Sequence, residues 1–404
     1  MEDAFGNVVN SASTSALAHY DRAVDAHLHA WPGVAESLDA SLAEAPDLAL
    51  AHALRALLHL GYGDTQAAKA SIASALSSSN AATDRERSHV EFIAMMVEGR
   101  GRDALQRVVD HADRYPTDLM AASTALGAYG LFAFSGRADH NEARLAFTES
   151  LARHAPDDFP WMLSYRGWAR IEANRVDEGL GMVQRAIALR RENGHNAHSV
   201  MHGFYETRDA ESALGFIDEW LAGYPESALM YGHLQWHAAL SELALEREDA
   251  AVARLTGPMT RHLRHARPYM SMIDWASLLW RLGLRGVRGL PVAQGQDYVA
   301  RHFQSGSNVF GEMHLAMLAI ATRDRTRLDV IRRRLDAHRE RGHEAAPIAL
   351  HWIDALEALV DGNQPAAQHH LDACSTAAVR IGGSHAQRQF IDETQKALRV
   401  PAFA

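Results

Sequence analysis

The chain has 404 residues, of which 47% are hydrophobic and 22% are charged, a composition typical of a folded globular protein. Its 40 Lys and Arg residues against 50 Asp and Glu residues give a formal net charge of −10. This balance argues against a nucleic-acid partner, because a phosphate backbone is bound by a basic surface. The basic run Arg332-Arg333-Arg334 is followed at once by Leu335-Asp336, and we interpret it as a solvated helix face.

The sequence carries no sign of secretion or of a membrane span. Cys374 is the only cysteine, so no disulfide can form within the chain. The first residues, Met1-Glu2-Asp3-Ala4-Phe5, lack the basic-then-apolar order of a signal peptide. No apolar run approaches the roughly 20 residues that span a bilayer. We therefore expect a cytoplasmic protein with no membrane partner.

Helix formers dominate the chain, and prolines divide it into units. The dividing strings are Pro46-Asp47, Pro116-Thr117-Asp118, Pro156-Asp157-Asp158 and Pro225-Glu226. Their spacing is close to one or two units of a helix-turn-helix repeat of ~34 residues, and proline suits the first turn of a helix. Two helices joined by a polar turn are predicted at residues 48–60 and 67–76, 161–173 and 179–189, and 229–245 and 250–255.

The predicted fold is all-α, a tetratricopeptide-like helical-repeat superhelix (an α-solenoid) that forms a single domain over residues 1–404. The helix-pair repeats are clearer over residues 16–255. Over residues 256–404 the period blurs, and we expect less regular pairs that pack as a C-terminal cap. A connector is expected at 286–291, and helices at 294–302, 312–321, 327–338, 346–360, 365–379 and 385–398. The alternative is a helical bundle without a repeat.

The main candidate site consists of four histidines in one predicted helical hairpin. His198 and His202 form one H-x-x-x-H pair, and His233 and His237 form another. Four residues turn a helix by ~400°, so each pair projects two imidazoles from one face. Three interpretations stay open: ligands of a transition metal such as Zn, Fe or Cu, catalytic or ligand-binding groups of a metal-free pocket, and histidines that stabilise helix packing.

Other residues could belong to such a site. Tyr205, Tyr231 and Trp236 lie in the same hairpin, as repeat core or as walls of a pocket. Asp274 could begin a helix or orient an imidazole, and His314 is a single histidine in a predicted helix.

The string Gly382-Gly383-Ser384-His385-Ala386-Gln387-Arg388 has two explanations. Ser384 and Gln387 have the spacing of a capping box that follows a glycine turn. His385 and Arg388 would then lie in the first turn of a helix, where a carboxylate or phosphate could bind. The alternative is that the whole string is structural.

Several strings resemble one family, the tetratricopeptide repeat protein 38 family with its bacterial relatives. They are LAHYDRAV at residues 17–24, PDLALAHAL at 46–54, SLLWRL at 277–282 shortly after Asp274, and RIGGSHAQR at 380–388. The H-x-x-x-H string at His198 and the H-x-x-W-H string at His233 fit the same family. The resemblance spans the chain and implies a fold and an inward-facing residue set, but no reaction.

We expect an inner pocket lined by the four histidines, which binds a small molecule or a metal, either as an enzyme of unidentified reaction or as a binding protein. The alternative is a protein- or peptide-binding tetratricopeptide adaptor. An adaptor that grips a peptide carboxylate should line its groove with Lys, Arg and Asn. Histidines and aromatic residues stand at the candidate positions instead, which favours a small-molecule ligand over a peptide.

Overall fold

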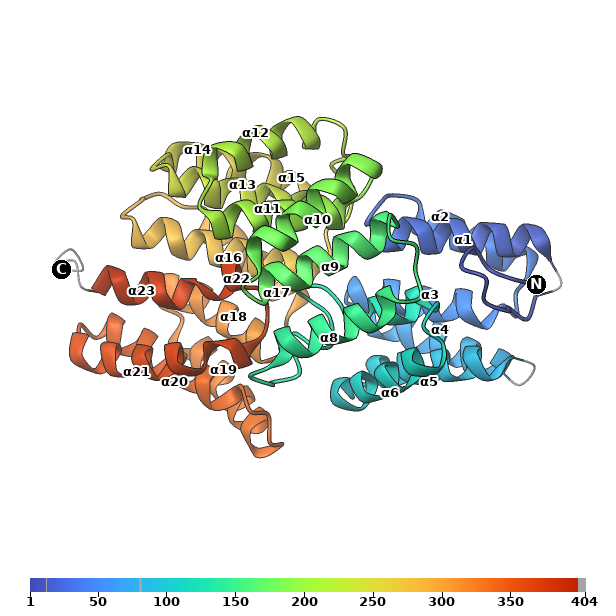
Figure 1. The fold of residues 1–404 in the computed structure, drawn as a ribbon. Coiled ribbons are helices and arrows are strands. Elements are labelled where there is room, and N and C mark those ends of the chain that lie inside the picture. The colour runs from blue at the N-terminus through green and yellow to red at the C-terminus, as the bar shows by residue number, and fades with distance from the viewer. Residues whose placement is uncertain (12, 80–81, 399–404) are drawn as a thin grey trace.

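The computed structural model describes residues 1–11, 13–79 and 82–398, and helices account for most of the chain (Figure 1). Helices make up 72% of the protein. The described residues contain no strand, and their one β contact is an isolated bridge between Glu2 and Val8. The all-α prediction is therefore confirmed.

The first twelve helices that the structure describes lie within residues 14–221. They are α1 Thr14–Leu28, α2 Val34–Glu44, α3 Ala49–Gly61, α4 Thr65–Ser78, α5 Asp84–Val97, α6 Gly101–Arg114, α7 Leu119–Ser123, α8 His140–Ala152, α9 Pro160–Glu172, α10 Val176–Leu189, α11 Gly194–Thr207 and α12 Ala210–Leu221.

The remaining helices complete the described chain. They are α13 Tyr231–Ala244, α14 Glu248–Arg254, α15 Thr260–His262, α16 Pro268–Leu284, α17 Val292–His302, α18 Val309–Ala321, α19 Arg325–Glu340, α20 Ala346–Val360, α21 Gln364–Ala377, α22 His385–Arg388 and α23 Phe390–Leu398. A π-helical turn, Leu255–Met259, and a 3-10 turn, Ala378–Ile381, link some of them.

Successive helices pack in adjacent pairs, which is consistent with a helical repeat. The closest pairs are α1 with α2, α3 with α4, α9 with α10, and α20 with α21. Small residues make the close approach possible: a Cβ on Gly167 of α9 would lie 2.7 Å from the carbonyl oxygen of Gly179 on α10. In Figure 1, α1–α6 occupy the right of the molecule, α8–α11 the centre and α18–α23 the left.

The prolines mark the boundaries between helices as expected, but they do not lie in the first turn of a helix, where they were expected. Pro46, Pro116, Pro156 and Pro225 lie in the turns before α3, α7, α9 and α13, outside the first helical turn. The prolines that do occupy the first turn of a helix are others, among them Pro160 in α9 and Pro268 in α16. A proline fixes its own φ and disfavours a helical conformation in the residue before it. It therefore marks a helix boundary both in the turn before a helix and in the first turn of the helix itself.

The repeat pattern is interrupted after α7. The Pro116-Thr117-Asp118 string does start a helix, with Asp118 as its N-cap, but α7 has only 5 residues. Residues 124–139 then form turns, in which Gly127 and Gly136 have φ values of 82° and 79°. Such positive values favour glycine, so these residues end the helical pattern.

Two further differences from the predicted elements occur in the C-terminal half. The helix predicted at 250–255 begins earlier, as α14, and leads into the π-helical turn that contains Pro258. The single helix predicted at 385–398 is two, α22 and α23, which are separated at Gln389.

Contacts far apart in sequence join the C-terminal string to the middle of the chain. Gln387 Nε2 donates a hydrogen bond of 2.6 Å to the Tyr129 hydroxyl. The His385 amide donates to Glu172 Oε2 at 3.1 Å, and Arg380 donates to the Gly136 carbonyl at 3.1 Å. The C-terminal helices therefore pack against α9 and the 124–139 turns.

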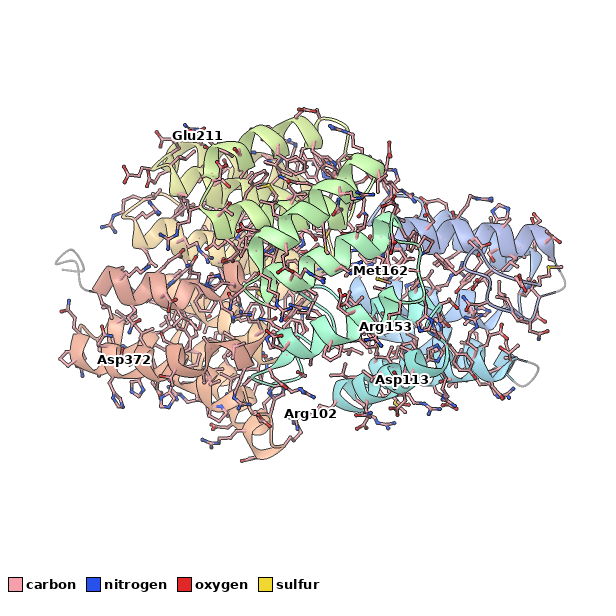
Figure 2. The ribbon with its side chains drawn as sticks, in the orientation of Figure 1. Arg102, Asp113, Arg153, Met162, Glu211 and Asp372 are labelled. Atoms are coloured by element: carbon pink, nitrogen blue, oxygen red, sulfur yellow. The ribbon has the colours of Figure 1, made fainter. Side chains whose placement is uncertain are left out.

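Charged side chains cover the outer surface, whereas apolar ones fill the space between helices. Glu211 on α12 and Asp372 on α21 are exposed, and Met162 on α9 is buried (Figure 2). Among the described residues, no helix combines the length and the apolar character that a membrane crossing needs.

Candidate functional site

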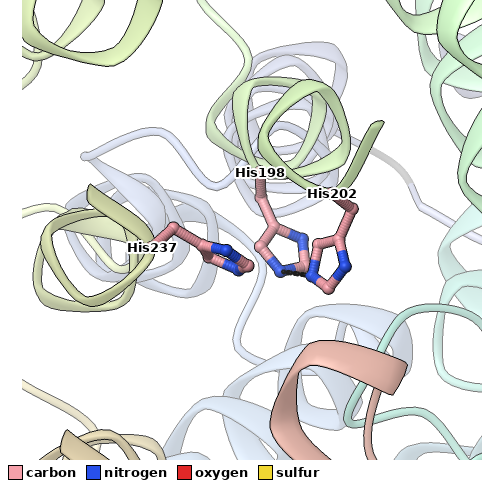
Figure 3. Close-up of side chains that lie close together, drawn as sticks. All are labelled: His198, His202 and His237. Atoms are coloured by element: carbon pink, nitrogen blue, oxygen red, sulfur yellow. Dashed lines mark hydrogen bonds between the residues drawn. The ribbon is translucent and has the colours of Figure 1, made fainter. Parts of the chain in front are cut away.

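The four histidines meet between α11 and α13, which do not form the single helical hairpin that was predicted, because α12 lies between them in the chain. His198 and His202 project from α11, and His233 and His237 project from α13, so that the pairs face each other as their spacing predicts (Figure 3, which draws three of them). His198 Nε2 lies 3.0 Å from the Nε2 atoms of both His202 and His233. The His237 ring centroid lies 4.5 Å from that of His202. The cluster is almost sealed from solvent, since His198, the most exposed of the four, is 6% exposed.

Local features of α11 place its two histidines against their neighbours. Asn193 caps the helix by accepting a hydrogen bond from the Asn196 amide at 2.9 Å. Gly203 lets α11 approach α10, since a Cβ there would lie 2.6 Å from Leu180 Cδ1. The i,i+4 spacing then directs His198 and His202 toward α13.

Two buried carboxylates hold the cluster from the outside. Asp274 of α16 lies 2.9 and 3.0 Å from His233 Nδ1 through its two oxygens, so it orients an imidazole. Glu172, at the end of α9, places Oε1 3.3 Å from His202 Nδ1, at ion-pair distance but without hydrogen-bond angles. Carboxylates that hold one ring nitrogen direct the other ring nitrogen inward.

Burial controls the electrostatics of the cluster. It lowers the pKa of His198 and of His237 well below the ordinary value, and the other imidazoles add to the shift. The pKa of His202 is also lowered by burial, against the opposing effect of Glu172. Burial raises the pKa of Asp274, and His233 opposes that shift. Burial alone would raise the pKa of Glu172, but His202 and the more distant arginines hold it at about 2.

The cluster has more nitrogen lone pairs than protons to share among them. If the carboxylates take the Nδ1 protons of His233 and His202, both Nε2 atoms point lone pairs toward His198 Nε2. His198 Nε2 carries at most one proton and can satisfy only one of them. His237 Nε2 is buried without a hydrogen-bond partner. A bound cation would satisfy nitrogens of His198, His202 and His237 together.

The ligand-atom geometry suits a metal ion. One nitrogen each from His198, His202 and His237 can be chosen so that all three lie within 4.8 Å of one another. Two nitrogens that are ~2.0–2.1 Å from a tetrahedral zinc ion lie about 3.3 Å apart. The 3.0 Å separation of His198 Nε2 and His202 Nε2 is close to that value. The buried histidines could therefore hold a metal ion.

A cavity of about 370 Å³ adjoins the cluster at His198. Its aromatic walls are Tyr129, Tyr165, Trp168 and Tyr269, and the Trp168 ring centroid is 5.1 Å from that of His198. The cavity is large enough for a small organic molecule. A ligand in this cavity would contact the histidine cluster at His198.

The aromatic residues proposed from the hairpin are only partly at the site. Trp236 stacks on His233 at 5.2 Å and meets His237 edge-on at 4.8 Å, but it does not line the cavity. Tyr231 packs against His262, with ring centroids 5.8 Å apart. Tyr205 hydrogen-bonds Gln389 and lines a different cavity, of about 570 Å³. The structure does not bring Tyr205 or Tyr231 to the histidine cluster.

His314 also lies apart from the cluster. It is fully buried in α18, where its Nδ1 lies 2.8 Å from the Phe310 carbonyl oxygen and its ring packs against Phe310 and Phe390. Burial lowers the pKa of His314 to about 4. These contacts make it a residue of the hydrophobic core.

The hydrogen-bond donors of the string at residues 382–388 bind acceptors within the chain. The capping box of Ser384 and Gln387 is present. His385 Nδ1 lies 2.8 Å from Glu206 Oε1, and the His385 amide is taken by Glu172. Arg388 Nη1 donates to the Gly383 carbonyl at 2.6 Å. A separate carboxylate or phosphate finds these donors already engaged, and neither His385 nor Arg388 lines the cavity at His198.

Sequence reasoning missed Glu172 and most of the cavity wall. Trp168 lies on α9, Tyr129 lies in the 124–139 turns, and Arg267 precedes α16. One signal was present: Gly127, Gly130 and Gly136 fall close together in a chain that is otherwise helical. An irregular segment within a helical repeat is often a place where the chain forms part of a binding site.

Two other groups have metal-ligating residues, and each has a structural role. Buried His89, His111 and Asp118 converge, but Arg85 also pairs with Asp118 at 2.5 Å and offsets its charge. His351, Asp354 and His370 lie nearer the surface, where Asp354 also pairs with Arg332 at 2.7 Å. In both groups an arginine competes for the only carboxylate.

No protein-family model matches the chain.

Proposed function

We propose that this protein binds one transition-metal ion through His198, His202 and His237, and that it acts as a metal-dependent enzyme on a small molecule held in the adjoining cavity. Zinc suits the three imidazoles best, with iron and copper as alternatives. The observation that carries the proposal is the convergence of buried ring nitrogens, 3.0 Å apart at His198 and His202, with His237 Nε2 left without a hydrogen-bond partner.

Three protein ligands and a fourth open position are typical of catalytic zinc, whereas four protein ligands close a structural site. We assign the three ligand positions to the histidines whose nitrogens lie mutually close. In this assignment the open position faces the cavity beside His198. A bound zinc ion would supply a Lewis acid and an activated water there.

The fourth histidine has a different role in this proposal. His233 is held by both oxygens of Asp274, which stabilises a proton on its Nδ1. An imidazole that a carboxylate orients in this way can take up and release a proton at Nε2. His233 is therefore the general acid or base, and Asp274 is its positioning residue.

We also propose that the helix pairs form a tetratricopeptide-like superhelix, in keeping with the resemblance of the sequence to the tetratricopeptide repeat protein 38 family. An adaptor that binds a peptide is the competing function for such a fold. The cavity volume of about 370 Å³ and its aromatic walls favour a compact small molecule.

Metal analysis tests the proposal. Wild-type protein purified without a histidine tag and supplied with zinc should hold about one metal ion per chain by mass spectrometry of the elements. His198→Ala and His237→Ala should each lose most of it, because each removes one of three ligands. Removal of the ion by a chelator should lower the melting temperature of the wild type, since a metal that binds only the folded state stabilises it.

His314→Ala is the matched control, because it deletes another buried imidazole that lies outside the cluster. It should retain the metal even though it costs stability. A wild-type protein that takes up no metal, or a His314→Ala variant that loses as much as the cluster variants, would overturn the proposal.

A further inference from the structure

The cavity at His198 is positively charged, whereas the protein as a whole is acidic. The chain carries a formal net charge of −10, yet no Asp or Glu lines the cavity. Arg267 is the one Lys or Arg side chain among the described residues that line it. The cavity is therefore a positively charged site in an acidic protein, which favours an anionic ligand.

Arg267 lacks the acidic partner that Arg85 and Arg281 have. Arg85 pairs with Asp118, and Arg281 pairs with Glu393 at 2.7 Å. Within the described chain, no carboxylate forms an ion pair with Arg267, and its buried Nε has no hydrogen-bond partner. Its guanidinium lies over the Tyr62 ring, 5.9 Å from the centroid. A half-buried cation with a buried, unpartnered Nε is costly without an anion, so an anion is expected from outside the chain.

The backbone makes room for this guanidinium. A Cβ at Gly61 would lie 2.9 Å from Arg267 Nε and 3.0 Å from Cζ. Gly61 itself ends α3 and lines the cavity. The close approach of α3 holds the arginine at the cavity wall.

The surroundings of Arg267 add hydrogen-bonding groups but no second charge. His27 and His195 also line the cavity. Burial, with the added effect of Arg267, lowers the pKa of each to about 3, so both are neutral at pH 7. One positive charge matches a monoanion, and a guanidinium binds a carboxylate with two parallel hydrogen bonds. A phosphate dianion would need more positive charge.

We propose that the cavity binds a small carboxylic acid with an aromatic or apolar body, that Arg267 binds its carboxylate, and that the opposite end of the molecule reaches His198. The aromatic walls of Tyr165, Trp168 and Tyr269 would contact the body of the ligand. The inference names the substrate class of the same site and so rests on the proposed function.

Binding of matched acids and alcohols tests the inference. The probes are ω-phenyl carboxylic acids with chains of two to six carbons and the corresponding ω-phenyl alcohols, measured by calorimetry on the zinc-loaded protein. At least one acid should bind wild type ten-fold or more tightly than its alcohol. Arg267→Met, which keeps the length of the side chain but removes the charge, should abolish that preference, and Arg267→Lys should restore part of it.

Arg341→Met is the control, because Arg341 lines a different cavity, of about 600 Å³, and should leave the preference unchanged. Melting temperatures establish that the variants fold. No preference for any acid in wild type, or a preference that survives in Arg267→Met, overturns the carboxylate inference.

Metal content measured on the same samples separates this inference from the proposed function. Zinc-loaded protein that does not distinguish acids from alcohols refutes the carboxylate inference alone. Protein that takes up no zinc when supplied with it, yet binds an acid through Arg267, refutes the metal proposal alone. Arg267→Met should keep its metal, because Arg267 is not among the ligands.

Discussion

At the scale of single residues, His198 has the central position in the cluster. Its Nε2 is the atom that both His202 and His233 approach, and it is also the member of the cluster that lines the cavity. The i,i+4 spacing predicted that each pair shares one helix face, and the packing of α11 against α13 brings the two pairs together. The spacing could not reveal Glu172 as the partner of His202, because that carboxylate comes from α9 through tertiary packing.

Two isosteric substitutions distinguish the three metal ligands from the general base. Glu172→Gln should weaken zinc binding ~10–100-fold, because it removes the charge beside a ligand histidine. Asp274→Asn should change zinc affinity far less, since its partner His233 is not a ligand in the proposed arrangement. Competition with a chromophoric chelator measures both affinities, with the exposed Asp372→Asn as the reference. Equal losses in the two variants would instead make His233 a fourth ligand.

Glu312 should make stability depend on pH. It is fully buried, Oε1 accepts a hydrogen bond from the Ser307 amide at 2.7 Å, and Oε2 has no partner. Burial raises the pKa of Glu312 to about 7, from a model-peptide value of 4.5. The folded protein therefore retains this proton where the unfolded chain has released it. Stability is lost as the pH rises from about 4.5 through about 7.

Glu312→Gln should remove the loss of stability that Glu312 causes as the pH rises. Its free energy of unfolding should exceed that of wild type by up to ~3 kcal/mol at pH 8, the equivalent of about 2.5 pKa units, and should match wild type near pH 4.5. Urea unfolding at the two pH values measures the difference. Glu211→Gln, at an exposed position, should show little change at either. A difference of the same size at both pH values would contradict the assignment.

At the scale of elements, the regular helices follow from local sequence and the irregular ones do not. The pair α9 and α10 was predicted nearly to the residue, because small residues and a polar turn repeat there. The short α7 is followed by turns in which Gly127 has a positive φ and a Cβ on Gly130 would lie 2.1 Å from the Leu126 carbonyl oxygen. The break between α22 and α23 also has no proline or glycine to mark it. Such features depend on contacts distant in sequence.

Gly382 tests how closely the turn before α22 packs. It has a φ of +90°, and a Cβ there would lie 2.5 Å from Phe134 Cδ1 and 2.6 Å from the Ala133 carbonyl oxygen. Gly382→Ala should therefore cost both backbone strain and displacement of these neighbours. Gly362→Ala isolates the strain, since Gly362 has a φ of +69° and nothing lies within 4 Å of its Cβ position.

We expect about 1–2 kcal/mol of destabilisation for Gly362→Ala and ~1–3 kcal/mol more for Gly382→Ala, measured by chemical unfolding. Equal losses would mean that the contact with the 124–139 turns contributes nothing beyond the glycine conformation.

At the scale of the whole molecule, the sequence predicted helix pairs better than their arrangement. Prolines and small residues indicated where pairs begin and how closely they pack. The position of α16 was not predictable in this way: it contacts α13, α18 and α23, and so carries both Asp274 and the turn with Arg267 to the site. Those contacts join segments with no common local pattern, and packing alone determines them.

The hydrogen bonds from Gln387 to Tyr129 and from His385 to Glu172 join residues 258 and 213 positions apart. Helices near the N-terminus can form on the ribosome as they emerge, since their contacts are local. Tyr129, in the wall of the cavity, cannot accept its hydrogen bond from Gln387 until that residue has been synthesised. These contacts between distant segments therefore form after the local helix pairs, whereas an open array could complete each unit in turn.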